Sequence, residues 1–141
     1  MQSRWPRSTR LAERVGPEGR LAAVGFSMGG AWSMWSPAQR DGFVASVVYY
    51  GTIEGPSLTR ASVPVLAHCA ETDPYESAEE VGKFEATLKA AGRNVTIHRY
   101  PGTGHWFAEP SQPAFRQGDA DLAFARTVDF IRRHMDAANR A

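Results

Sequence analysis

The segment Gly25-Phe26-Ser27-Met28-Gly29 constrains this chain more than any other part of its sequence. It has the form G-x-S-x-G, and it stands between an apolar run over residues 20–26 and a stretch of small residues that can begin a helix. A serine in such a turn needs small neighbours two positions before and after it, because the backbone turns sharply and passes close to itself. The motif therefore predicts a strand, a tight turn and a helix, in that order.

Apolar runs and helix-like segments alternate along the rest of the chain. Further strands are predicted over residues 43–50, 63–70 and 94–100, and the last alternates apolar and polar residues, as expected for an edge or half-exposed strand. Apolar strands separated by helices are typical of a parallel sheet. We therefore expect an α/β fold with about four mostly parallel strands flanked by helices. It forms one domain over residues 1–141, in which residues 1–18 are a helix or arm.

Two helices have clear local signals. Over residues 77–91, Ser77 and Glu80 can form a capping box, and Gly92 can end the helix. Over residues 119–138, apolar residues recur at three- and four-residue spacing, which predicts a helix that packs on the sheet through one stripe. The predicted stripe consists of Leu122, Ala125, Val128, Ile131 and Met135.

Ser27 has candidate catalytic partners after two other predicted strands. A serine hydroxyl is a weak nucleophile without a base, and His105 follows the fourth strand in a glycine-rich loop. Asp73 follows the third strand and can hold the tautomer of that histidine, with Glu71 and Glu76 as the alternative acids. A structural interpretation without catalysis also stays open. In it the turn has no catalytic role, His105 is an ordinary loop histidine and Asp73 caps a turn.

The first amides of the predicted helix point toward an oxygen bound over Ser27, so the Met28 N–H is a candidate oxyanion donor. Phe26, Trp106 and Phe107 are candidates for an apolar substrate pocket, with ordinary core packing as the alternative. No residue cluster has metal-ligand spacing and no glycine loop fits a phosphate, so neither a metal nor a cofactor is expected.

His68 and Cys69 are interpreted as core residues, because neighbouring side chains of a strand point to opposite faces and cannot act as a couple. Composition excludes other classes of function. Sixteen Lys and Arg against 15 Asp and Glu give a formal net charge of +1, and without a long basic run we expect no nucleic-acid partner. No run approaches the roughly 18 apolar residues of a membrane span, and a single cysteine agrees with a reducing compartment, so a cytoplasmic location is expected.

Three segments resemble the dienelactone hydrolase family of α/β-hydrolases: RLAAVGFSMGG at 20–30, VPVLAHCAETDPYES at 63–77 and YPGTGHWF at 100–107. The resemblance extends over residues 18–136 and implies an α/β-hydrolase fold with Ser27 as nucleophile, Asp73 as acid and His105 as base. The enzymes that give the family its name use a cysteine nucleophile and an arginine just after the histidine. This chain has Ser27 and no such arginine, which indicates a serine esterase-like relative.

The family resemblance also implies that this chain is short. The usual fold has further strands before the nucleophile turn and a loop there that completes the oxyanion hole, whereas only about 19 residues precede the first strand here. We therefore expect a truncated fold whose strand over Arg20 to Phe26 is an exposed edge. That edge is expected to pair with a second copy in a homodimer or with a separate N-terminal chain. A fragment of a longer product is a third interpretation.

Two functions follow as hypotheses. The first is a serine hydrolase of small esters or lactones, with activity lowered by the missing oxyanion donor. The second is a non-catalytic or weakly active hydrolase-like subunit that pairs through its first strand.

Overall fold

The computed structural model describes residues 19–140, and these form four strands and four helices in alternation. The helix or arm expected over residues 1–18 lies outside the described residues. In chain order the elements are β1 (Leu21–Phe26), α2 (Met28–Gln39), β2 (Phe43–Tyr49), α3 (Pro56–Arg60), β3 (Val65–Thr72), α4 (Ala78–Ala90), β4 (Val95–Gly104) and α5 (Gln117–Arg140).

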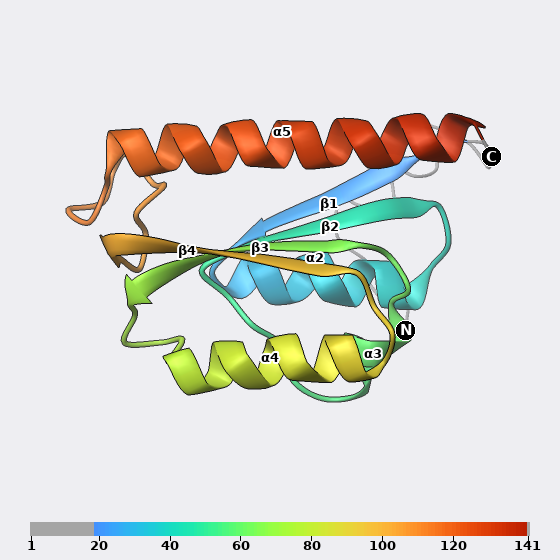
Figure 1. Cartoon of the computed structure of the whole chain (residues 1–141), viewed down its shortest axis with the longest axis horizontal. Helices are drawn as coiled ribbons and strands as arrows, with labels where there is room; N and C mark the ends of the chain where they lie inside the picture. Colours follow the sequence, from blue (N-terminus) through green and yellow to red (C-terminus); the bar gives the residue numbers. More distant parts are fainter. Residues whose placement is uncertain (1–18, 141) are drawn as a thin grey trace, which may run out of the picture.

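The four strands form one parallel sheet in the order β1-β2-β3-β4, which confirms the expected α/β architecture. Each connection moves to the next strand in the same direction, and right-handed crossovers then put every connecting helix on the same face. Figure 1 shows this arrangement, with α2, α3 and α4 on one side of the sheet and α5 on the other. The carboxyl ends of all four strands therefore meet at one edge of the molecule.

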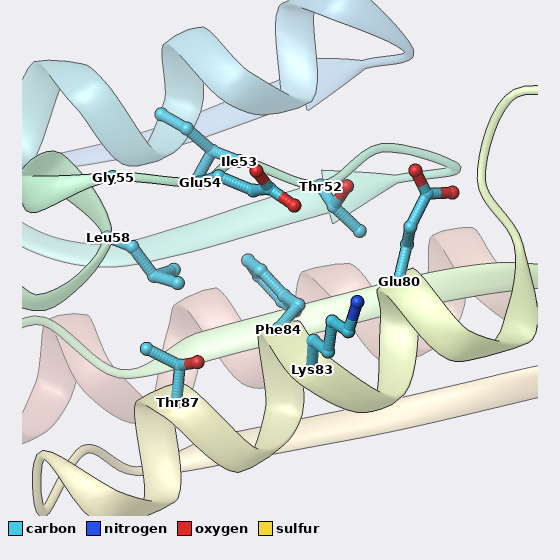
Figure 2. Close-up of a pocket in the computed structure, with 9 residues that line it drawn as sticks. All are labelled: Thr52, Ile53, Glu54, Gly55, Leu58, Glu80, Lys83, Phe84 and Thr87. Carbon is cyan, nitrogen blue, oxygen red and sulfur yellow. The ribbon is translucent and has the colours of Figure 1, made fainter.

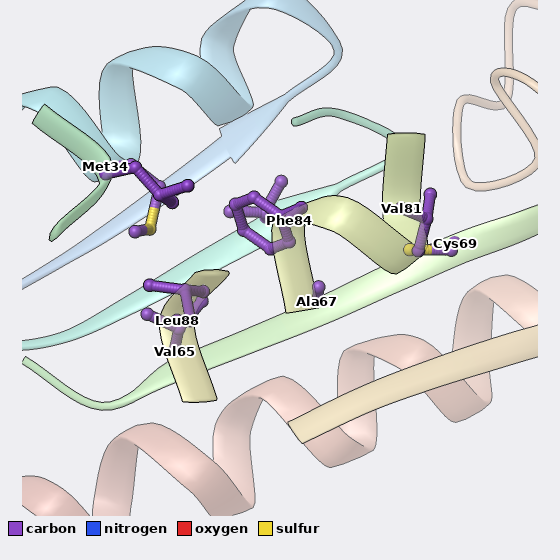
Figure 3. Close-up of a cluster of buried hydrophobic side chains, with 9 residues drawn as sticks. Met34, Val65, Ala67, Cys69, Val81, Phe84 and Leu88 are labelled. Carbon is purple, nitrogen blue, oxygen red and sulfur yellow. The ribbon is translucent and has the colours of Figure 1, made fainter. Parts of the chain in front are cut away.

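Two apolar clusters hold the layers together. On the first face, Met34 of α2, Val65 of β3 and Phe84 of α4 belong to one cluster of buried side chains (Figure 3). On the other face, Ala123 and Phe130 of α5 pack in a second cluster with side chains of β2 and β3. Helix α4 begins at the predicted capping box: Ser77 Oγ accepts a hydrogen bond from Glu80 N, and Glu80 Oε2 accepts one from Ser77 N.

The predicted contact stripe of α5 is only partly right: Ile131 packs against the cluster on the sheet side, but the other four members are not among the residues that the helix buries. The residues that the helix buries are Ala123, Thr127 and Phe130, whereas Leu122 is 44% exposed. The physical reason is a polar contact: Thr127 Oγ1 lies 2.7 Å from the Tyr49 hydroxyl and 2.9 Å from His68 Nε2, all three residues being buried. These hydrogen bonds hold the face of α5 that contains Thr127 against the sheet. Apolar periodicity alone does not predict that face.

Strand β1 lies at an edge of the sheet and pairs only with β2 among the described residues. Its side chains alternate between the two faces. Ala22 packs against the cluster on the α5 side, and Val24 and Phe26 point to the same side but remain 43% and 46% exposed. The expected apolar edge is therefore present.

Candidate active site

Ser27 occupies a strained turn at the carboxyl end of β1. Its φ and ψ are 55° and −121°, in the left-handed half of the backbone map that non-glycine residues rarely adopt. The turn closes so tightly that a Cβ on Gly25 would lie 1.8 Å from the carbonyl oxygen of Gly29. The Cβ of a side chain at Gly51, just after β2, would lie 2.5 Å from the carbonyl oxygen of Ser27. Glycines at these positions let the serine project beyond the sheet.

The side chains of Ser27, His105 and Asp73 form a continuous hydrogen-bonded chain. Ser27 Oγ lies 2.8 Å from His105 Nε2, and His105 Nδ1 lies 2.7 Å from Asp73 Oδ2. A carboxylate accepts hydrogen bonds, so the Asp73 contact favours the tautomer in which Nδ1 carries the hydrogen. The Nε2 lone pair is then free to accept the hydrogen of the Ser27 hydroxyl. Such an arrangement can transfer a proton from the serine to the histidine.

The carboxylate of Asp73 is fixed from both sides. Its Oδ1 accepts hydrogen bonds from the backbone N–H groups of Tyr75 at 2.9 Å and Glu76 at 3.2 Å, which leaves Oδ2 for His105. The side chains of Asp73 and His105 are only 1% and 4% exposed. Burial and the two amides restrict the carboxylate to the orientation that meets the imidazole.

Neither of the alternative acids contacts His105. Glu71, near the end of β3, accepts a hydrogen bond from the N–H of Gly102, near the end of β4, at 2.8 Å. Glu76 accepts a hydrogen bond from the Thr52 hydroxyl at 2.5 Å, and burial raises the pKa of its carboxyl. Both carboxylates connect loops at the carboxyl ends of the strands.

Backbone strain among the described residues gathers around His105. Three non-glycine residues have positive φ, namely Ser27 at 55°, Tyr50 at 38° and Trp106 at 70°. Ser27 is hydrogen-bonded to the imidazole, and the rings of Tyr50 and Trp106 lie 5.1 Å and 4.7 Å from it. Such strain persists only where the surrounding structure enforces it, and functional sites are where it most often collects.

The other residues singled out in the sequence have mixed placements. Met28 is the first residue of α2, so its N–H has no acceptor within the helix, and its side chain is 77% exposed. Phe26 stacks on Tyr49 with 4.4 Å between ring centroids and stays half exposed near the serine. Phe107 is wholly buried in the cluster under α5, so its proposed place in an open pocket is wrong. Its ring packs in the core against that of Tyr100, with 4.9 Å between the centroids.

Two aromatic residues at the site were not predicted. Tyr50 packs against His105, and its hydroxyl is buried without a hydrogen-bond partner among the described residues. Tyr75 is 70% exposed, with its ring 4.8 Å from the imidazole. The position of Tyr75 two residues after Asp73 is a usable signal, because a turn that caps its own aspartate brings that residue back over the carboxylate.

A cavity of about 280 Å³ lies between α4 and the loop after β2. Figure 2 shows Leu58 and Phe84 at its apolar side, with Lys83 and Glu80 on α4 beside it. None of the three hydrogen-bonded residues lines it. Within residues 19–140 no group of three His, Cys, Asp or Glu side chains is arranged to hold a metal ion, and none of the helices there could cross a membrane.

Comparison with known proteins places these observations in a family. The model of the dienelactone hydrolase family matches residues 8–135. Carboxymethylenebutenolidase 1 of Cupriavidus pinatubonensis is 34% identical over 119 residues, which cover 80% of this chain and 48% of that protein. Carboxymethylenebutenolidase of a Pseudomonas species is 30% identical over 120 residues, covering 82% of this chain and 49% of that protein. The chain thus spans about half the length of the curated relatives it matches.

A solved structure has the same fold. A dienelactone hydrolase-like promiscuous phosphotriesterase from metagenomic libraries superposes with a TM-score of 0.70 at 16% sequence identity. The match covers 79% of this chain and 51% of that one. At this identity the likeness concerns the fold, an α/β-hydrolase sheet with flanking helices.

Proposed function

Because this chain belongs to the dienelactone hydrolase family, we propose that it hydrolyses small carboxylic esters or lactones with Ser27 as its nucleophile. The observation that carries the proposal is the hydrogen-bonded chain from Ser27 Oγ through His105 to Asp73, with distances of 2.8 Å and 2.7 Å. This is the geometry that a serine needs if a histidine is to remove its proton during attack. Each of the three residues also follows a different strand of the sheet.

The proposed reaction has two halves. Ser27 Oγ attacks the carbonyl carbon while His105 Nε2 accepts the serine proton, and the resulting oxyanion lies near the Met28 N–H at the start of α2. Collapse of this intermediate breaks the carbon–oxygen bond of the ester, and His105 returns its proton to the departing oxygen. Water then attacks the acyl-serine with His105 as base, which releases the acid and restores Ser27.

Asp73 has a supporting role in this scheme. It keeps the hydrogen on Nδ1 and stabilises the imidazolium that forms at each step, without becoming protonated itself. The half-exposed ring of Phe26 and the partly buried ring of Trp106 are the proposed apolar walls of the substrate site. The nucleophile proposed here is a serine, where the family's name-giving enzymes have a cysteine. Because a serine hydroxyl is a weak nucleophile, its attack on the ester depends on the removal of its proton by His105.

A fluorophosphonate probe tests the proposal, because it attaches covalently only to an activated serine. We expect one probe per chain, with mass spectrometry locating it on Ser27 and none on Ser27→Ala. Turnover of p-nitrophenyl acetate and of an unsaturated lactone should disappear in the same variant. Hydrolysis that survives Ser27→Ala at the wild-type rate would contradict the mechanism.

The exposed edge of β1 favours a second role, in assembly. Val24 and Phe26 are nearly half exposed on a strand that has one partner in the described chain. We propose that β1 pairs antiparallel with β1 of a second copy, which forms a homodimer with one continuous sheet. In this role the chain would be a weakly active subunit that serves mainly as a binding module. Light scattering should give a dimer mass that Val24→Lys lowers. Thr96→Lys, on the edge strand β4, is the matched control.

A monomer at micromolar concentration would overturn the homodimer. A monomer that assembles only with a separate polypeptide would show that the edge serves another partner.

We also propose a reducing, cytoplasmic location, which is supported by Cys69 being the only cysteine of the sequence and unpaired.

A further inference from the structure

Three aromatic rings contact the imidazole of His105, and they differ in how much solvent they meet. The ring centroids of Tyr50, Trp106 and Tyr75 lie 5.1, 4.7 and 4.8 Å from that of His105. Tyr50 is 1% exposed and Trp106 is half-buried, whereas Tyr75 is 70% exposed. Of these three rings, that of Tyr75 is the most exposed to solvent.

The hydrogen bond beneath Tyr75 is shielded from water. His105 Nδ1 and Asp73 Oδ2 are 2.7 Å apart, and the two side chains are 4% and 1% exposed. Both residues lie on surface loops at the end of the sheet, where side chains are usually wet. The ring of Tyr75, largely exposed and packed against this buried imidazole, therefore lies on the solvent side of His105.

The backbone of Tyr75 is held by the carboxylate of Asp73. Its backbone N–H donates to Asp73 Oδ1 at 2.9 Å, and the N–H of Glu76 donates to the same oxygen at 3.2 Å. The Glu76 side chain is bound to Thr52, and Ser77 caps α4 directly afterwards. The turn over residues 73–77 thus fixes Asp73 and the backbone of Tyr75 as one unit. The contact with His105 is made by the ring, inclined 61° to the imidazole.

From these contacts we propose that Tyr75 is a positioning residue that closes the outer side of the His105–Asp73 hydrogen bond and keeps the imidazole aligned with Ser27. The proposal rests on the serine hydrolase function proposed above. A hydrogen bond to a carboxylate is stronger when water cannot compete for it. The aromatic ring also provides a favourable neighbour for the imidazolium that forms during the reaction.

Two variants separate the ring from the hydroxyl, and a third serves as control. Tyr75→Phe keeps the ring contact, and Tyr75→Ala removes it. Phe124→Ala removes an aromatic side chain of similar exposure, 67%, on α5. Because Tyr75 and Phe124 are both surface residues, all three variants are expected to fold, and their thermal unfolding provides the check.

Two measurements report on the proposal. The first is the low-field proton NMR signal of the hydrogen on His105 Nδ1, assigned by its absence in His105→Gln, together with its rate of exchange with water. The second is the rate constant for attachment of a fluorophosphonate to Ser27. We expect Tyr75→Ala to lose the NMR signal by exchange and to react on the order of tenfold more slowly, as expected for a misplaced base. Tyr75→Phe and Phe124→Ala should resemble the wild type in both measurements.

Two results would overturn the role of Tyr75. One is an NMR signal in Tyr75→Ala with the wild-type exchange rate, and the other is a Tyr75→Phe variant as impaired as Tyr75→Ala. The NMR measurement needs no catalysis, so it remains decisive if Ser27 fails to react with the probe. A wild-type chain with a protected Nδ1 hydrogen and an unreactive Ser27 would refute the hydrolase function alone.

Discussion

Gly25 lies directly against the backbone of Gly29, so that a Cβ on Gly25 would stand 1.8 Å from the Gly29 carbonyl oxygen. The two glycines of the motif therefore have different roles. At Gly29 itself a Cβ would meet no heavy atom within 4 Å. The first glycine is required by the close approach of β1 and α2, and the second is not required for any contact within the described chain.

This difference predicts that Gly25→Ala destabilises the chain and that Gly29→Ala does not. Gly25→Ala should lower the free energy of unfolding by about 1–3 kcal/mol or more, because a backbone oxygen cannot move aside as a side chain can. It should also abolish probe attachment to Ser27, since the turn must open. Gly29→Ala is the control and should unfold at nearly the wild-type temperature. Equal melting temperatures for the two variants would contradict this account of the turn.

Asp73→Asn should leave the fold intact and lower ester hydrolysis on the order of 10³- to 10⁴-fold, because an amide can donate to Nδ1 and so favours the wrong tautomer of His105. Steady-state kinetics measure the effect. Glu76→Gln, in the same turn, is the matched control, since its side chain contacts Thr52 and not the imidazole. A near-wild-type rate in Asp73→Asn would point to another acid.

Stability should fall in acid through His68. Burial lowers the pKa of His68 in the folded chain to about 3, whereas in the unfolded chain it is about 6.5. Between these values the unfolded state binds more protons, so the free energy of unfolding decreases as the pH falls, by up to about 1.4 kcal/mol per pH unit. Well above pH 6.5 the histidine is neutral in both states, and this contribution no longer changes with pH.

Chemical denaturation at pH 7.5 and pH 5 measures this loss. His68→Gln should show a smaller loss between the two pH values than the wild type, whatever its stability at pH 7.5. Burial also lowers the pKa of His134, which lies half-buried near the end of α5, so His134→Gln should reduce the dependence as well, but by less than His68→Gln. An unchanged pH dependence in His68→Gln would refute the assignment.

Cys69 should be unreactive in the native chain. The thiol is buried at 4% exposure, and burial raises its pKa to about 12, so almost no thiolate forms at neutral pH. An Ellman-type reagent is expected to label Cys69 only as fast as the chain unfolds, and rapidly in denaturant. Phe124→Cys adds a thiol at a position that is 67% exposed on α5 and should react at once. Rapid labelling of the native wild type would show that β3 is accessible.

Local patterns predicted much of the secondary structure. The strand expected over residues 43–50 is observed as Phe43–Tyr49, and the helix expected over 77–91 as Ala78–Ala90 with Ser77 as its cap. These elements are specified by neighbouring residues, through apolar runs and a capping box. The short helix Pro56–Arg60 was not predicted, because five residues contain too few apolar positions to show a period.

The face that α5 turns toward the sheet could not be predicted from local sequence patterns. Its sequence offers several apolar residues per turn, and periodicity alone chose Leu122 for the sheet. The structure instead buries Thr127, because His68 and Tyr49 are polar groups in the core that need hydrogen-bond partners. Tyr49 and His68 are each more than fifty residues from Thr127 in the sequence, so no local window of the sequence contains this information.

The sequence by itself determined the turn at Ser27, the alternation of strands and helices, and the order in which Ser27, Asp73 and His105 follow their strands. Their catalytic role stays a prediction. Only the tertiary structure decided that the three side chains meet within hydrogen-bonding distance, that Phe107 belongs to the core, and that the ring of Tyr75 contacts that of His105. These relations depend on how the parallel strands align their carboxyl ends and on which side chains exclude water there. Such packing is a property of the assembled sheet, and no single segment carries it.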